Sequence, residues 1–273
     1  MDLSNFFNYE FVQRAFIAGI LIAAISSILG VFLVLRRFSL IGDGLAHVTF
    51  GSVAVVMLMG VSPLYITLAA LPLVMISSIA ILKLTGSKRI QGDAAIGIVS
   101  SIGIATGIVL ASLSGGYNLD LFSYLFGNIL TVTQAELLLS LMVFIIVVAA
   151  VMIFYDDLLA VTFDEELAQS MGIKTKRINM ILFLLTAVAA VLAMKIAGIM
   201  LVSAMLILPP LTALQLSLSF KTTIFSSALI SVLSVLCGLL LAFLLNLPAG
   251  GTIVMVNICF LLVVLGTKKI LSA

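Results

Sequence analysis

Nine stretches of the chain are apolar over about 20 residues, the length of helix that crosses a hydrocarbon core about 30 Å thick. They are residues 12–35, 40–60, 63–84, 94–113, 134–154, 178–194, 197–217, 223–246 and 252–267. Unpaired backbone groups are costly in lipid, so segments of this kind are expected to be helices. The sequence therefore predicts an all-α, polytopic transmembrane bundle of eight or nine spans, with some of the helices broken.

Composition supports this fold class. Hydrophobic residues make up 63% of the 273 residues and charged residues 9%, with a mean hydropathy of +1.40. Such values exclude a soluble globular protein. The first apolar stretch is too long for a signal-peptide core and lacks a cleavage site, so we expect it to be retained. We interpret residues 1–273 as a single transmembrane domain.

The positive charges predict an orientation. Eleven of the 13 Lys and Arg residues lie in alternate connections, and only Arg14 and Lys195 break the pattern. The eleven are Arg36, Arg37, Lys83, Lys88, Arg89, Lys174, Lys176, Arg177, Lys221, Lys268 and Lys269. Cytoplasmic loops are rich in Lys and Arg. We therefore expect a multi-pass protein of the cytoplasmic (inner) membrane, with its N-terminus outside and its C-terminus inside.

Three features blur the count of spans. The sixth and seventh stretches are divided only by Lys195 and Gly198, and residues 119–133 are compatible with a short or re-entrant helix. Pro209 and Pro210 lie within the seventh stretch, where prolines remove backbone donors. We expect this pair to interrupt the helix, as a hinge or beside a cavity.

The one sizeable hydrophilic segment, residues 156–177, is expected on the cytoplasmic side. Its centre, residues 164–168, is acidic at the start and is followed by Gly172, which are start and stop signals of a short helix. Such a helix is either an ordinary solvated connection or a docking element for a soluble partner.

Asp43 and His47 are the main candidates for function. His47 is the one histidine of the chain, and residues four apart share a helix face. If Arg37 marks the membrane surface, a rise of about 1.5 Å per residue places His47 about 15 Å deeper. Ionisable residues at such a depth are rare and are by default functional.

Imidazole and carboxylate together suit Zn²⁺, Mn²⁺ or Fe²⁺. One chain offers only two such ligands here, whereas two copies about a two-fold axis would offer four. The alternative without an ion is that Asp43 and His47 bond each other or nearby backbone groups as a polar helix contact.

Motifs for catalysis are missing from the sequence. It contains no phosphate-binding Gly-x-x-x-x-Gly-Lys-Ser/Thr, no His-Glu-x-x-His and no Gly-x-Ser-x-Gly. We therefore expect no enzymatic activity, no permanently bound cofactor and no nucleic-acid partner.

Several segments together resemble the integral-membrane permease subunits of zinc/manganese/iron ABC importers. Residues 35–47, from the paired arginines to Asp43 and His47, are similar to that family's arginine-rich turn and Asp-x-x-Ser/Ala-His helix. Residues 163–172 are similar to its Phe-Asp-x-Glu-x-Ala-x-x-x-Gly segment, carried here by Phe163, Asp164, Glu166, Ala168 and Gly172. Residues 123–130 and 201–209 add further matches.

The resemblance implies a dimer of this subunit, two cytoplasmic ATP-binding subunits that dock on residues 163–172, and an extracytoplasmic metal-binding protein. It also implies metal transport past Asp43 and His47 by alternating access, driven by ATP hydrolysis in the partner. Zinc is favoured over manganese or iron. The main alternative from another class is an ATP-independent secondary metal transporter, which a lack of further intramembrane carboxylates disfavours.

Overall fold

The computed structural model describes residues 9–62, 65–86, 92–113, 127 and 132–271. This part of the chain is all α-helical and contains no strand. Its helices are α2 (Glu10–Leu35), α3 (Ile41–Leu58), α4 (Ile66–Thr85), α5 (Gly92–Leu113), α7 (Gln134–Ile153), α8 (Tyr155–Phe163), α9 (Glu165–Ser170), α10 (Thr175–Ala197), α11 (Ile199–Gln215), α12 (Phe220–Leu245) and α13 (Ala249–Leu271). The predicted all-α bundle is confirmed.

Each of the nine predicted apolar stretches corresponds to one helix. Among the described residues, eight helices are long and apolar enough to cross a membrane, and α11, with 17 residues, is a shorter apolar helix. Gly198 separates α10 from α11 with a φ of 79°, a conformation that glycine adopts without strain. The short or re-entrant helix expected at residues 119–133 lies almost entirely outside the described residues.

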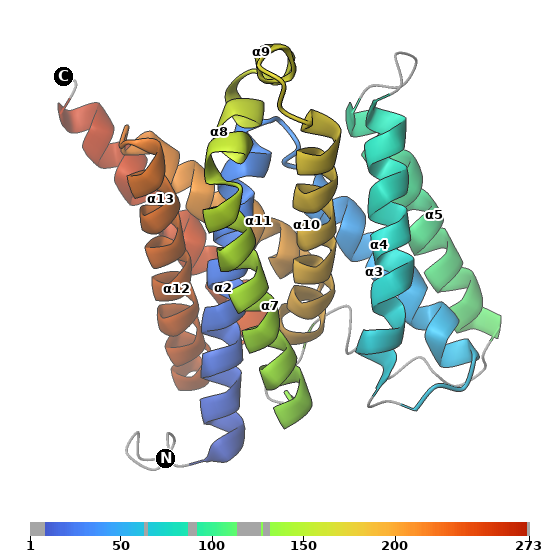
Figure 1. The fold of residues 1–273 in the computed structure, drawn as a ribbon. Helices are drawn as coiled ribbons and strands as arrows, with labels where there is room; N and C mark the ends of the chain where they lie inside the picture. The colour runs from blue at the N-terminus through green and yellow to red at the C-terminus, as the bar shows by residue number, and fades with distance from the viewer. Residues whose placement is uncertain (1–8, 63–64, 87–91, 114–126, 128–131, 272–273) are drawn as a thin grey trace.

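The bundle is built around α2, α3 and α10, whose spans are mostly buried, whereas few residues of α5 and α13 are buried. Figure 1 shows α4 and α5 along one side, α12 and α13 along the other, and α2, α7, α10 and α11 between them. Large apolar side chains such as Ile102 and Met255 face outward. An apolar outer surface of this kind suits lipid or a second membrane chain.

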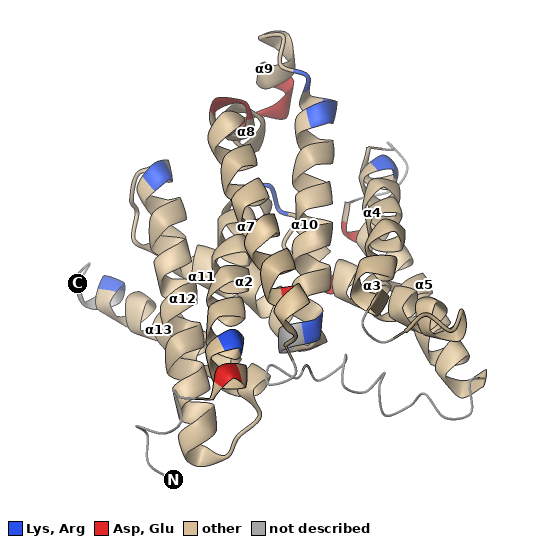
Figure 2. Ribbon diagram, turned by 60° about the horizontal axis from the view of Figure 1, so that its bottom comes forward, with Lys and Arg blue, Asp and Glu red and all other residues tan. Residues whose placement is uncertain are grey.

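α8 and α9 project beyond one end of the bundle, and α2 begins at the opposite end (Figure 1). Basic residues gather at the end where α8 and α9 lie, as Figure 2 shows at the start of α10 and α12 and at the end of α4. Arg14 and Lys195 lie elsewhere, as their positions in the sequence predict.

The prediction that Pro209 and Pro210 interrupt the seventh helix is wrong, because α11 runs through both prolines to Gln215. Proline cannot donate to the carbonyl four residues earlier, which leaves the carbonyls of Met205 and Leu206 without their usual helical donors. The Leu206 carbonyl oxygen lies against Gly30 of α2, where a Cβ would come within 2.2 Å of it. Close packing against Gly30 thus accommodates the proline pair within a continuous helix.

Candidate metal centre

Asp43 and His47 lie one turn apart on α3. Asp43 is in the first turn, where a carboxylate interacts favourably with the helix dipole. The Nε2 atom of His47 lies 3.5 Å from the Oδ2 atom of Asp43. The structure therefore places the two predicted site residues side by side on one helix face.

The pair is accessible although α3 is mostly buried. Of the two side chains, that of Asp43 is 51% exposed and that of His47 is 23% exposed. Their neighbours Gly42, Gly44 and Ala46 are buried. The carboxylate thus opens away from the packed interior of the single chain.

The spacing of these two atoms is compatible with a shared metal ion. At 3.5 Å it exceeds the usual hydrogen-bond range. Two atoms at that separation can both lie about 2.1 Å from one ion, at an angle of about 110° between the two bonds. His47 Nδ1 is buried and has no hydrogen-bond partner among the described residues, so the contact with Asp43 does not satisfy the ring completely.

A third polar group comes from α11. The Ser203 hydroxyl lies 3.4 Å from Asp43 Oδ1 and donates a long hydrogen bond to it. No local sequence pattern predicts this serine in the site, because the contact joins residues 160 positions apart. In the part of the chain that the structure describes, no group of three or more His, Cys, Asp or Glu side chains could hold a metal.

Glycines allow α3 to approach its neighbours closely. A Cβ on Gly42 would come within 2.7 Å of Leu206 Cδ1 on α11, and one on Gly44 within 2.6 Å of Ile96 Cγ2 on α5. A Cβ on Gly51 would stand 2.3 Å from the Gly103 carbonyl oxygen. The contact at Gly51 is with backbone and leaves no room for a side chain, so this glycine fixes the approach of α3 to α5.

The predicted coupling residues lie at the projecting end of the bundle. Asp164 caps α9 by accepting a hydrogen bond from the Leu167 amide at 2.9 Å, and Gly172 ends the turn after α9 with a φ of 89°. Phe163 is exposed but contacts the ring of Phe220 at 5.8 Å between centroids. The predicted short helix is thus present as α9.

The other predicted coupling residues differ in how exposed they are. Glu166 is exposed, whereas Ala168 is fully buried and acts as the inner contact of α9. Leu167 and Met171 present large apolar side chains to the outside. An exposed acidic and apolar surface of this kind suits a protein partner.

Arg36 links this end to the bundle. Its guanidinium contacts Glu165 of α9 and Asn179 of α10. Burial lowers the pKa of Arg36 from its ordinary value, and the Glu165 carboxylate acts in the opposite direction. The positive-inside pattern identified Arg36 only as a surface charge, so this contact was missed.

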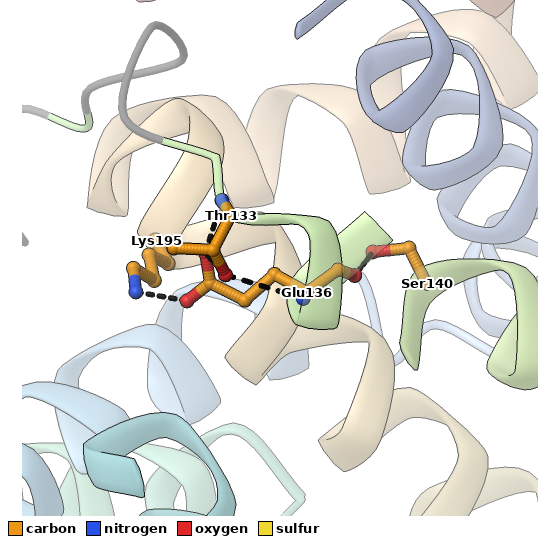
Figure 3. A network of polar contacts seen from close by, with 4 residues as sticks. All are labelled: Thr133, Glu136, Ser140 and Lys195. Carbon is orange, nitrogen blue, oxygen red and sulfur yellow. Dashed lines mark hydrogen bonds and ion pairs between the residues drawn. The ribbon is translucent and has the colours of Figure 1, made fainter. Parts of the chain in front are cut away.

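The sequence also did not predict a second polar network, which Figure 3 shows. Lys195 near the end of α10 forms an ion pair with Glu136 in the first turn of α7, and both side chains are largely buried. The Glu136 carboxylate also accepts from the Thr133 amide and hydroxyl, at 3.0 and 2.9 Å. In the sequence, Lys195 stood out only as an exception to the charge pattern.

A multi-pass helical bundle that holds a partly exposed Asp–His pair within a buried helix is the architecture of a membrane permease for a cation. The comparisons with known proteins agree with this class. The model of the ABC 3 transport family matches residues 8–268. The chain therefore belongs to the ABC 3 transport family and is the permease of a metal ABC importer.

Named relatives cover almost the whole chain. It is 35% identical over 256 residues to the manganese import system permease protein ScaB of Streptococcus gordonii, which covers 94% of this chain and 91% of the relative. It is 32% identical over 254 residues to the manganese transport system membrane protein MntC of Listeria monocytogenes, with coverage of 93% and 89%.

A solved structure has the same fold. PsaBC from Streptococcus pneumoniae in complex with Fab aligns with a TM-score of 0.85 and 31% identity, over 96% of this chain and 95% of that chain. The resemblance found in the sequence is confirmed. The preference for zinc is not confirmed, since the names of both relatives refer to manganese.

Proposed function

We propose that this chain is the permease subunit of an importer that moves manganese into the cytoplasm, with zinc as the competing cargo. The main support for this proposal is the Asp43–His47 pair, in which His47 Nε2 lies 3.5 Å from Asp43 Oδ2 and both side chains are partly exposed. A carboxylate and an imidazole accept Mn²⁺, Fe²⁺ and Zn²⁺, so the ligands alone do not select one metal. The names of the relatives favour manganese.

The complete transporter contains two copies of this chain. One chain brings two ligands to the site, and the Asp43 carboxylate is half exposed. A second copy related by a two-fold axis near Asp43 would bring the number of ligands to four. An ion held between two copies can be released when they move apart, as transport requires.

ATP is hydrolysed by a separate cytoplasmic subunit that docks on α8 and α9. This role is supported by the exposed surface of Phe163, Asp164, Glu166 and Leu167. An extracytoplasmic metal-binding protein delivers the ion to the opposite end. The basic residues near α8 and α9 support a cytoplasmic location for that end, with the N-terminus outside and the C-terminus inside.

Uptake into proteoliposomes tests this function. The chain is reconstituted with its ATP-binding subunit and delivery protein, and accumulation of radiolabelled manganese and zinc is measured with and without ATP. We expect accumulation of manganese that requires ATP and the partner subunit, and that excess zinc reduces. Accumulation by this chain alone, without ATP, would instead identify a secondary transporter.

A further inference from the structure

Arg36, Glu165 and Asn179 form a closed ring of hydrogen bonds between three segments. Arg36 Nη1 donates to Asn179 Oδ1 at 2.7 Å, and Arg36 Nη2 donates to Glu165 Oε2 at 2.8 Å. Asn179 Nδ2 donates to the other carboxylate oxygen of Glu165, also at 2.8 Å. The ring therefore joins the end of α2, the first residue of α9 and the first turns of α10.

The ring is shielded from solvent at Arg36, whose side chain is 6% exposed. The side chain of Glu165 is 45% exposed. Asn179 is buried. A buried guanidinium without partners is strongly unfavourable. Arg36 and Glu165 are therefore expected to keep their contact when α9 moves, rather than to separate and leave the charge alone.

Arg36 is also tied to the turn that leads into α3. The Phe38 amide donates to the Leu33 carbonyl at 2.9 Å and Arg37 has a φ of 61°, so α2 ends in a Schellman motif. The Arg36 guanidinium lies 5.5 Å from the centre of the Phe38 ring. Phe38 in turn meets Phe183 of α10 edge to face, with 5.4 Å between centroids.

α3 begins at Ile41, only three residues after Phe38, and carries Asp43 in its first turn. A turn this short and this constrained moves with the helix that follows it. The contacts of Glu165 and Arg36 thus connect α9 with the helix that holds Asp43 and His47.

We propose that Arg36 is a positioning residue that couples the docking helix α9 to the metal-carrying helix α3. The inference rests on the proposed function and adds the route between the ATPase contact and the metal site. Coupling of this kind requires an element whose position both sites bias. The α2–α3 turn, attached to Glu165 on one side and continuous with α3 on the other, is that element.

Arginine is suited to this role for a geometric reason. Its planar guanidinium bonds the Glu165 carboxylate and the Asn179 amide at once with two fixed donors. Lysine has a point charge on a flexible chain and does not reproduce this fork. Replacement of Arg36 by lysine therefore keeps the charge but loosens the link.

The test uses the full complex with its ATP-binding subunit and delivery protein in proteoliposomes. Radiolabelled manganese import and ATP hydrolysis are measured in the same vesicles for Arg36→Lys, Arg36→Gln and Glu165→Gln. Arg37→Gln is the matched control, because it removes the neighbouring charge from an exposed position in the same turn. The ratio of ions imported to ATP hydrolysed reports the coupling.

We expect Arg36→Gln to lower this ratio by about tenfold, because charge-assisted hydrogen bonds are among the stronger ones in proteins. Hydrolysis continues, since α9 still docks. Glu165→Gln and Arg36→Lys lower the ratio by less, and Arg37→Gln leaves it unchanged. A purely structural role would instead reduce import and hydrolysis together, in proportion to the amount of complex assembled.

A charge exchange keeps the test decisive if Arg36→Gln does not assemble. The double variant Arg36→Glu/Glu165→Arg is expected to recover part of the ratio that Arg36→Glu alone loses. Unchanged ratios in the assembled Arg36 variants, or no recovery in the exchanged pair, would overturn the inference while leaving the proposed function intact. Failure of the unmodified complex to import manganese with ATP would refute the proposed function itself.

Discussion

Gly103 of α5 lies directly against the backbone of His47. A Cβ built on Gly103 would stand 2.8 Å from the His47 carbonyl oxygen and 2.6 Å from the Val48 Cα atom. Both are backbone atoms that cannot swing aside. The close approach of the His47 backbone to α5 therefore depends on a residue without a side chain in that helix.

Gly103→Ala is expected to displace α3 from α5 and to reduce metal import. Overpacking of this kind costs about 1–3 kcal/mol. Gly97→Ala is the matched control, because a Cβ there meets no atom within 4 Å and alanine favours the helix. Manganese uptake and thermal stability in detergent are measured for both. Equal behaviour of the two variants would contradict the packing argument.

Glu136→Gln removes the ion pair with Lys195 and is expected to destabilise the protein by about 2 kcal/mol, because two largely buried groups lose a charge-assisted contact. The double variant Glu136→Gln/Lys195→Met removes both charges and is expected to be more stable than Glu136→Gln alone. The thermal unfolding midpoint of the purified protein measures this. If the double variant loses as much stability as Glu136→Gln and Lys195→Met lose together, the two residues do not act as a pair.

Asp164→Ala removes the cap of α9 and is expected to destabilise that helix by about 1 kcal/mol. Asp164→Asn keeps an oxygen acceptor for the Leu167 amide and is expected to retain the helix. Hydrogen exchange of the amides at residues 165–170 should therefore be faster in Asp164→Ala than in Asp164→Asn. Equal exchange in the two variants would show that the cap does not hold α9.

The helices were predictable because apolar length is a local property of the chain. All nine stretches became helices, with ends within a few residues of the predicted ones. The Asp43–His47 contact was predictable for the same reason, since residues four apart meet on one helix face. Gly172 and Asp164 likewise act as the stop and start signals that their residue types indicate.

Contacts between distant segments were not predictable. Arg36 reaches Glu165 and Asn179 across 129 and 143 residues, and Ser203 reaches Asp43 across 160. No local pattern encodes such pairs. The proline pair in α11 was misjudged because its effect depends on Gly30 of another helix, which leaves room for the Leu206 carbonyl.

Import of radiolabelled manganese by Asp43→Ala and His47→Ala tests most directly whether the pair lies on the metal path. Thr49→Val is the control, since its buried hydroxyl on the same helix bonds the Leu45 carbonyl, at 2.7 Å. We expect that both site variants assemble with the ATP-binding subunit and import no manganese, while Thr49→Val imports normally. Normal import by the two site variants would show that Asp43 and His47 only pack α3, and that the metal crosses elsewhere.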